Sequence, residues 1–347
     1  MLTQNKFDNA EIPFLSICIP SYNRPDELQR LLDSIDSRQG EIIEIVIAED
    51  CSPRREAIKQ VVDMYKAKSS YKVNYLENEI NYGYDHNIRH LADSANGTWV
   101  MFMGDDDVFV PGSLDMFLKF LQEHQTLGYV MRRYRNKYLD GSVEEFRYDS
   151  KDVFFSAGEQ SYVELFRRSV FISGFCFRKE CFNDYGCSEY DGTLLFQLYI
   201  EAIVCLNYPS AYCDIPITMS IEGGIPYFGS SEAESHLYKS GVNTVANSLN
   251  FMKQVKILAE SIDRKNNIKC AQYIINTYSK YSYGFLLSQR DNGLKIYMDY
   301  ARELKKMGYA SSWYFYVYYY LLLVFGRVGS RMIISTIKRM VGKTPKL

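Results

Sequence analysis

Apolar residues in the first third of the chain follow two alternating spacings. Short runs rich in β-branched residues predict buried strands at 15–19, 42–48, 72–76 and 99–103. Between these runs, apolar residues recur three and four positions apart, as at Leu28, Leu31 and Leu32, which predicts helices. Strands separated by helices imply right-handed crossovers, so we expect an α/β fold with a mostly parallel sheet flanked by helices.

The pattern changes further along the chain. It weakens into charged, Tyr-rich sequence from about 128 to 160, and it predicts a helix over 189–206. Beyond about 231 the apolar spacing is helical almost throughout. The expected organisation is a domain over 1–230, with halves at about 14–115 and 116–230, and a helical C-terminal region over 231–347.

Composition narrows the class of protein. A net charge of -2 argues against a nucleic-acid partner, because a nucleic-acid binder normally carries a basic excess. The eight cysteines are scattered without a CxxC pair, which argues against a thiolate metal site and favours a reducing compartment. Residues 1–12 are polar and lack the apolar core of a signal peptide, so we expect a cytoplasmic protein.

The C-terminal tail combines aromatic and basic residues. Residues 313–325 (WYFYVYYYLLLVF) form an apolar run shorter than the roughly 20 residues that span a bilayer. Cations follow this run, and no acidic residue occurs from 327 onward. The pattern predicts a peripheral helix that contacts the inner face of the cell membrane through 313–347. A helix buried against the α/β domain, or the interface of a homodimer, explains the same pattern equally well.

Three polar clusters follow predicted strands. They are Pro20-Ser21-Tyr22-Asn23, Glu49-Asp50 and Asp105-Asp106-Asp107. Ligands of an open parallel sheet bind beyond the carboxyl ends of its strands, so we expect these clusters to meet in one cleft. Adjacent carboxylates about 4 Å apart repel by several kcal/mol at intermediate dielectric, and a bound cation relieves that repulsion. The acidic run therefore predicts Mg²⁺ or Mn²⁺ holding a substrate diphosphate, with a solvated acidic turn as the alternative.

Five motifs occur in register over about residues 14–115. They are Pro20-Ser21-Tyr22-Asn23-Arg24, Glu49-Asp50-Cys51-Ser52, Asn81-Tyr82-Gly83 with Asn87, Ala95-Asn96-Gly97-Thr98-Trp99 and Met103-Gly104-Asp105-Asp106-Asp107. In their order and spacing, the chain resembles a family 2 glycosyltransferase with the GT-A fold. The resemblance implies that 14–115 is the nucleotide-binding half of a catalytic domain and that 116–230 is its acceptor half.

The resemblance also implies which residues bind the nucleotide sugar. They are Pro20, Ser21, Tyr22, Arg24, Glu49, Asp50, Asn81, Gly83, Asn87 and Asp105. The DXD position of the family implies Asp106 as the first metal ligand, with Asp105 and Asp107 beside it. Two positions depart from the family pattern: Glu49 stands where an Asp usually bonds the base, and Gly104 stands where the first Asp of the motif usually falls.

A carboxylate that deprotonates the acceptor is expected in the second half of the domain. By resemblance, Asp191 is the first candidate for this base and Glu189 the second, while a carboxylate that only stabilises the start of a helix is the alternative. Ser173-Gly174-Phe175 is expected near the donor sugar, again by resemblance. His86 and His90 are spaced for one helix face without further metal ligands, which favours a surface or pocket-lining role. The segment 223–229 (GGIPYFG) predicts either a mobile lid or a fixed turn.

Together these features predict an inverting glycosyltransferase. Such an enzyme moves a sugar from a nucleoside-diphosphate donor to a hydroxyl of a saccharide acceptor, plausibly lipid-linked and belonging to a bacterial surface polysaccharide. Two alternatives remain at this point. One is a nucleotidyltransferase or another phosphoryl-transfer enzyme, although the chain has no basic phosphate-gripping loop. The other is a non-catalytic protein that binds nucleotide sugars.

Overall fold

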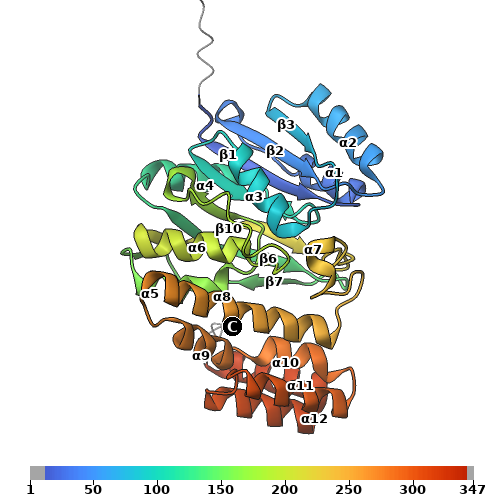
Figure 1. Cartoon of the computed structure of the whole chain (residues 1–347), viewed down its shortest axis with the longest axis vertical. Coiled ribbons are helices and arrows are strands. Elements are labelled where there is room, and N and C mark those ends of the chain that lie inside the picture. Colours follow the sequence, from blue (N-terminus) through green and yellow to red (C-terminus); the bar gives the residue numbers. More distant parts are fainter. Residues whose placement is uncertain (1–11, 342–347) are drawn as a thin grey trace, which may run out of the picture.

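The computed structural model describes residues 12–341, so the first eleven residues of the expected domain and the last six of the expected membrane-contacting tail lie outside it. A ten-stranded sheet crosses the molecule in the order β3-β2-β1-β4-β9-β6-β10-β5, with β7 paired to β6 and β8 to β10 (Figure 1). The strands are β1 (Leu15–Ser21), β2 (Ile43–Glu49), β3 (Lys72–Glu77), β4 (Trp99–Phe102), β5 (Val108–Phe109), β6 (Tyr129–Lys137), β7 (Val143–Phe146), β8 (Val153–Phe155), β9 (Phe175–Arg178) and β10 (Ser210–Ile221).

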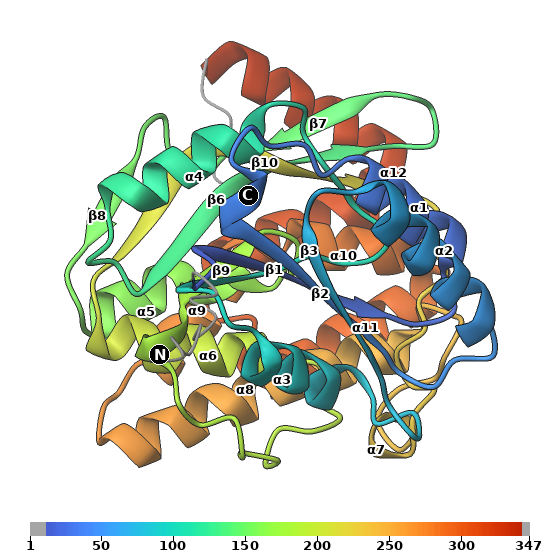
Figure 2. The ribbon, with the colours of Figure 1, turned by 90° about the horizontal axis from the view of Figure 1, so that it is seen from above.

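Helices cover both faces of this sheet and form the C-terminal region. They are α1 (Pro25–Asp33), α2 (Arg55–Lys68), α3 (Tyr84–Ser94), α4 (Ser113–Glu123), α5 (Glu159–Phe166), α6 (Phe196–Asn207), α7 (Glu232–Ser235), α8 (Val245–Asn266), α9 (Ala271–Lys280), α10 (Tyr283–Arg290), α11 (Leu294–Lys306) and α12 (Trp313–Val341). The view from above separates α1, α2 and α4 from α3, α6 and α8 on opposite sides of the sheet (Figure 2). The predicted α/β fold with flanking helices is confirmed.

Strand direction divides the sheet into two parts. β3, β2, β1 and β4 are parallel to one another, as the alternating pattern predicts. β9 then lies antiparallel between β4 and β6, and β7 forms an antiparallel hairpin with β6. The sheet is therefore mixed rather than mostly parallel, because the β6–β7 hairpin reverses direction without a crossover helix and β5, β8 and β9 pair antiparallel with strands distant in the sequence.

Alternate side chains of the central strands enter two different cores. Ile17 and Ile19 on β1 pack with α1, α2 and α4, whereas Cys18 packs on the other face with α3 and α6. The second core continues without a break into α8–α12, so the helical region is bound to the α/β domain through shared apolar contacts. Successive side chains of β1 point to opposite faces of the sheet, and helices cover both faces, so β1 is buried on both.

The helix predicted over 189–206 begins only at Phe196. Gly192 and Leu194 adopt positive φ angles of 84° and 66°, which interrupt a helical path. The carboxylate of Asp85 on α3 accepts the backbone N–H groups of Leu194 and Phe196, so it satisfies donors at the new helix start. The predicted boundary was too early, and Glu189 and Asp191 lie in the preceding loop rather than on the helix.

Candidate functional site

A cleft of about 360 Å³ lies at the carboxyl edge of the parallel strands. It is lined by Pro20, Ser21, Tyr22, Arg24, Asp50, Asn81, Gly83, Tyr84, Asn87, Gly104, Asp105, Asp106, Ile172, Gly224, Pro226, Tyr227, Phe228, Ser230, Glu234 and Asn243. The cleft thus brings together nine of the ten residues expected to contact the donor, together with Asp106. Its lining also continues past residue 230, where the boundary between the α/β domain and the helical region was expected.

Arg24 is the cation that holds the acidic run. Its Nη1 atom lies 2.8 Å from Oδ1 of Asp105 and 3.1 Å from Oδ2 of Asp106. Asp105 also accepts the backbone N–H of Tyr22 at 3.1 Å, which ties the end of β4 to the end of β1. Burial raises the pKa of Asp105 to about 7, against the opposing effect of Arg24. A nearby positive charge is therefore needed to keep this carboxyl ionised at neutral pH.

Asp107 points away from the cleft. Its carboxylate accepts the hydroxyl of Ser173, and the same Ser173 Oγ accepts the backbone N–H of Gly104 at 3.0 Å. A Cβ at Gly104 would lie 3.1 Å from that oxygen, so the absence of a side chain at 104 accommodates the Ser173 contact. The Ser173 segment, which was expected near the donor sugar, instead supports the acidic run from behind through this contact.

The two cleft-facing aspartates fit a divalent cation. The Asp105 and Asp106 carboxylates already converge on one positive group, the Arg24 guanidinium, within 3.1 Å. Carboxylate oxygens are the ligands that Mg²⁺ and Mn²⁺ prefer. No cluster of three or more His, Cys, Asp or Glu side chains arranged to hold a metal occurs within residues 12–341. Asp105 and Asp106 would therefore hold a cation jointly with oxygens of a bound diphosphate rather than alone.

Asp50 shapes the opposite end of the cleft. Its two carboxylate oxygens accept the backbone N–H groups of Tyr82 at 3.0 Å and Gly83 at 2.8 Å, and Asn78 donates to it at 2.8 Å. Gly83 has a φ of 89°, and a Cβ there would lie 2.5 Å from the hydroxyl oxygen of Ser231. A side chain at 83 is therefore excluded by both backbone angle and space. In the same cleft, the buried hydroxyl of Ser21 has no hydrogen-bond partner among the described residues.

Glu49 does not line the cleft, contrary to its expected contact with the base. Its fully buried carboxylate accepts the backbone N–H groups of Cys51 and Ser52 and pairs with Arg55 at 2.5 Å. These bonds hold the turn between β2 and α2. Glu49, which departs from the family pattern, therefore has a structural role here.

The two candidate bases differ in their surroundings. Asp191 pairs through Oδ2 with Arg89 on α3 at 3.0 Å, and its Oδ1 is buried without a hydrogen-bond partner in the described part of the chain. Glu189 is paired with Lys265 on α8 and accepts the Ser261 hydroxyl at 3.1 Å. The Glu189 carboxylate is thus occupied by the helical region, while Asp191 retains one oxygen for another donor.

The segment 223–229 lies over the cleft, where four of its residues contribute to the lining. The Arg24 guanidinium donates to the carbonyl of Ile225 at 2.5 Å and lies 5.1 Å from the ring centre of Tyr227. Glu234 on α7, which belongs to none of the motifs, accepts the N–H groups of Tyr84 and Gly229 at 2.6 Å. This buried carboxylate joins the covering segment to the start of α3.

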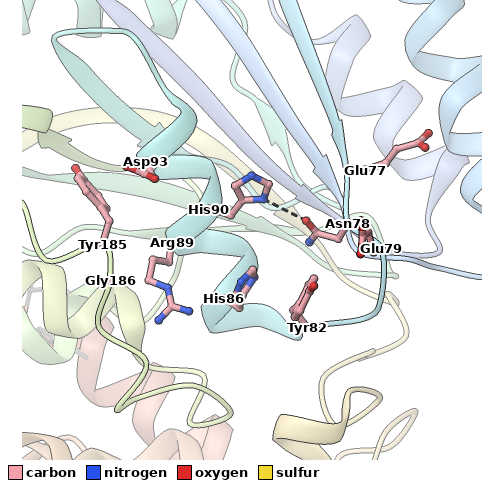
Figure 3. A pocket seen from close by; sticks show the side chains of 10 residues that line it. All are labelled: Glu77, Asn78, Glu79, Tyr82, His86, Arg89, His90, Asp93, Tyr185 and Gly186. Carbon is pink, nitrogen blue, oxygen red and sulfur yellow. Dashed lines mark hydrogen bonds between the residues drawn. The ribbon is translucent and has the colours of Figure 1, made fainter.

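His86 and His90 line a second pocket of about 450 Å³ beside the cleft (Figure 3). The predicted pocket-lining role is therefore confirmed. His86 stacks on Tyr82 with ring centres 4.3 Å apart, and Nδ1 of His90 lies 3.1 Å from Oδ1 of Asn78. Desolvation and the charge of Arg89 lower the pKa of His86, so its imidazole is neutral at pH 7.

Known proteins resemble the chain mainly over the half that carries the acidic run. The family model described as glycosyl transferase family 2 matches residues 16–177. An uncharacterized glycosyltransferase of Haemophilus influenzae is 30% identical over 116 residues, which are 33% of this chain and 37% of that protein. The abequosyltransferase RfbV of Salmonella typhimurium is 28% identical over 107 residues, or 31% of this chain and 32% of that protein.

A longer alignment joins the chain to a Campylobacter jejuni protein named GalNAc(5)-diNAcBac-PP-undecaprenol beta-1,3-glucosyltransferase. It is 24% identical over 202 residues, which are 55% of this chain and 61% of that protein. The chain thus spans less than two thirds of the length of each of these three relatives.

A solved structure shares the fold over nearly the whole chain. The structure of S. aureus TarS 1-349 in complex with UDP-GlcNAc has a TM-score of 0.55 at 16% identity, covering 96% of this chain and 93% of that one. The likeness concerns the fold, and it includes the helical C-terminal region. The segment matched by the family model contains β1, β2, β4 and the acidic run, so the part of the chain that is similar to family 2 glycosyltransferases is the part that builds most of the cleft, within a GT-A fold.

Proposed function

We propose that this protein is an inverting glycosyltransferase that uses a nucleoside-diphosphate sugar. The observation that carries the proposal is the convergence of Asp50, Arg24 and the Asp105–Asp106 pair in one cleft at the carboxyl edge of the parallel strands. This cleft offers polar contacts at one end and charges for a diphosphate at the other. TarS was solved with UDP-GlcNAc, which makes a uridine donor the first to test.

The diphosphate end of the cleft assigns roles to three side chains. Asp106 and Asp105 would hold Mg²⁺ or Mn²⁺, and the bound cation would supply Lewis-acid stabilisation of the departing nucleoside diphosphate. Arg24, which pairs with both aspartates, would then be free to contact a phosphate oxygen. Asp107 acts indirectly by holding Ser173 and Gly104 in place.

In this proposal Asp191 is the general base. Its unpartnered Oδ1 would accept the proton of the acceptor hydroxyl while the acceptor oxygen attacks the anomeric carbon from the face opposite the leaving diphosphate. The glycosidic bond to the acceptor forms as the bond to the diphosphate breaks, so the anomeric configuration inverts. Arg89 orients the carboxylate through Oδ2.

The acceptor of the proposed reaction is a saccharide hydroxyl, plausibly on a lipid-linked oligosaccharide of a bacterial surface polysaccharide. The name of the Campylobacter jejuni relative, which begins with an undecaprenol-linked saccharide, supports this class. A nucleotidyltransferase would need several cationic side chains that bind phosphate. Among the residues that line the cleft, Arg24 alone is an arginine or lysine. The transferase proposal therefore accounts better for this lining.

The test of the function is turnover of a nucleotide sugar. A panel of uridine-, guanosine- and thymidine-diphosphate sugars should include one donor that raises the melting temperature of the protein with Mn²⁺ and is slowly hydrolysed to free nucleoside diphosphate. A ligand at free concentration L that binds the native state stabilises it by RT ln(1 + L/Kd), so binding raises the melting temperature. Binding without hydrolysis or transfer by any donor would favour a non-catalytic binding protein, and release of a sugar 1-phosphate would favour a nucleotidyltransferase.

We further propose that α12 places this enzyme on an anionic membrane surface. Its inner face is fixed to the protein, since Leu322 is fully buried and its carbonyl accepts from Arg290 at 2.8 Å. Its outer face carries an exposed apolar stripe. Before the kink at Gly326, where φ is 62° and ψ is -167°, the stripe comprises Trp313, Tyr316, Val317, Tyr320 and Val324.

The charge and length of α12 favour a helix lying in the interface. The segment 313–334 has a mean hydropathy of 1.3, and it is the one helix within residues 12–341 that is long and apolar enough to cross a membrane. Only 11% of its apolar window is buried. A helix with one face packed on its own protein would lose those contacts by inserting across a bilayer. Six cations and no acidic residue follow from 327, which complements anionic lipid.

The stripe can be tested with two charge substitutions. Val317→Asp/Val324→Asp should lower co-sedimentation with phosphatidylglycerol–phosphatidylethanolamine vesicles by at least about tenfold, because burial of each Val contributes about 1.5 kcal/mol. Met116→Asp, equally exposed on α4, is the control and should bind as the unsubstituted protein does. If the unsubstituted protein does not bind vesicles but has a dimeric mass, and the double variant has a lower mass, the stripe binds a second copy of the chain and not a membrane.

A further inference from the structure

The pocket beside the cleft is separated from it by a thin wall. Residues 78–83 form this wall, with Asn78 and Tyr82 facing the pocket and Asn81 and Gly83 facing the cleft. Asn78 spans the wall through its amide, because Nδ2 donates to Asp50 on the cleft side while Oδ1 meets His90 on the pocket side. The pocket is therefore close to the proposed donor site and distinct from it.

The side chains around this pocket are polar or aromatic. The lining comprises Glu77, Asn78, Glu79, Tyr82, His86, Arg89, His90, Asp93, Tyr185 and Gly186 (Figure 3). The carboxylates of Glu79 and Asp93 make no hydrogen bond among the described residues, and Nδ1 of His86 is buried without a partner. The pocket thus combines unused acceptors with the aromatic rings of Tyr82 and Tyr185.

These groups select among classes of ligand. Three carboxylates surround one arginine, and Arg89 is already bonded to Asp191 and to the carbonyl of Cys187. An anionic ligand would therefore meet net repulsion. A neutral polyol suits the site, because neighbouring hydroxyls donate to carboxylates and accept from imidazole or amide, and the apolar face of a sugar ring packs on an aromatic side chain.

Arg89 links this pocket to the reaction. It lines the pocket from α3, and its Nη2 bonds the carboxylate of Asp191 at 3.0 Å. Tyr185 and Gly186 come from the same loop as Asp191, so an occupant of the pocket lies beside the loop that carries the proposed base. We propose that the pocket binds a neutral saccharide unit of the acceptor next to the unit that receives the sugar. This inference rests on the proposed transferase function.

Ligand-observed NMR on the full chain tests the proposal with three probes: the methyl β-glycosides of glucose, galactose and N-acetylglucosamine. With UDP and the diamagnetic Mg²⁺ present to fill the donor cleft, at least one glycoside should show saturation transfer. In Glu79→Ala/Asp93→Ala the dissociation constant should rise about tenfold, which corresponds to the loss of hydrogen bonds to charged acceptors. Both side chains are exposed, so folding is not at risk.

A matched double variant, Glu41→Ala/Glu56→Ala, removes the same charge from exposed sites outside the pocket and should bind as the unsubstituted protein does. No saturation transfer to any of the three glycosides, or equal binding by both double variants, would overturn the proposal. The UDP signals are an independent readout. If the unsubstituted protein does not bind UDP, the transferase function is contradicted. If it binds UDP but none of the glycosides, only the acceptor pocket is contradicted.

Discussion

Asp106→Ala should reduce sugar transfer by about 10³-fold and leave the fold intact. The loss follows because Asp106 is the cleft-facing carboxylate best placed to hold the cation, and Lewis-acid stabilisation of a leaving group is worth several kcal/mol. The fold should survive because the side chain is 28% exposed and its ion pair is with Arg24, which keeps Asp105 as a partner. The measurement is nucleoside-diphosphate release with saturating donor and Mn²⁺, beside the melting temperature.

The control for this variant is Asp26→Ala, which removes an exposed carboxylate from α1 outside the cleft. It should keep activity within about twofold, as is usual for surface substitutions away from a site. Full activity of Asp106→Ala in the same assay would contradict the assignment of the acidic run to the diphosphate end of the cleft.

In the presence of UDP, addition of Mn²⁺ should raise the melting temperature of the unsubstituted protein more than that of Asp106→Ala.

Asp191→Asn should lower transfer by about 10²- to 10⁴-fold, the usual contribution of a general base. The substitution preserves shape and one acceptor oxygen for Arg89, so donor affinity should change little. Single-turnover transfer at fixed donor saturation measures the chemical step, and a UDP titration measures donor binding. The expected signature is a loss of rate with unchanged affinity for UDP.

Glu189→Gln is the matched comparison, since Glu189 lies two positions away in the same loop. Its carboxylate pairs with Lys265 and Ser261 of α8, so its neutralisation should leave the rate within about twofold and lower only the stability of that contact. A large loss of rate in Glu189→Gln, with a small one in Asp191→Asn, would exchange the two assignments.

Local pattern predicted the elements around the cleft well. The four parallel strands and the helices between them follow from apolar spacing, and the polar clusters at their carboxyl ends meet because parallel strands end on the same edge. The mixed half of the sheet was less predictable. Apart from the β6–β7 hairpin it pairs strands that lie far apart along the chain, such as β4 with β9 and β6 with β10, so their direction depends on contacts that no local spacing records.

Two site assignments show where sequence reasoning stops. Glu49 sits at the position expected to contact the nucleotide, yet its carboxylate bonds to the backbone of Ser52 and pairs with Arg55 at the start of α2. Asp107 belongs to the acidic run, yet its carboxylate accepts the hydroxyl of Ser173, 66 residues away along the chain. In neither case does the position in the motif show which way the side chain points.

The sequence by itself determined the alternating α/β order, the edge at which the polar clusters gather and the motifs whose residues line the cleft. These properties depend on periodicity and on neighbours along the chain. The tertiary structure alone decided that Glu234 joins the covering segment to α3, that Asp191 has a buried oxygen without a partner among the described residues whereas Glu189 is paired, and that His86 and His90 line a separate pocket. Those outcomes depend on contacts between segments up to 150 residues apart, and their energies come from burial and hydrogen bonding that exist only after the chain has folded.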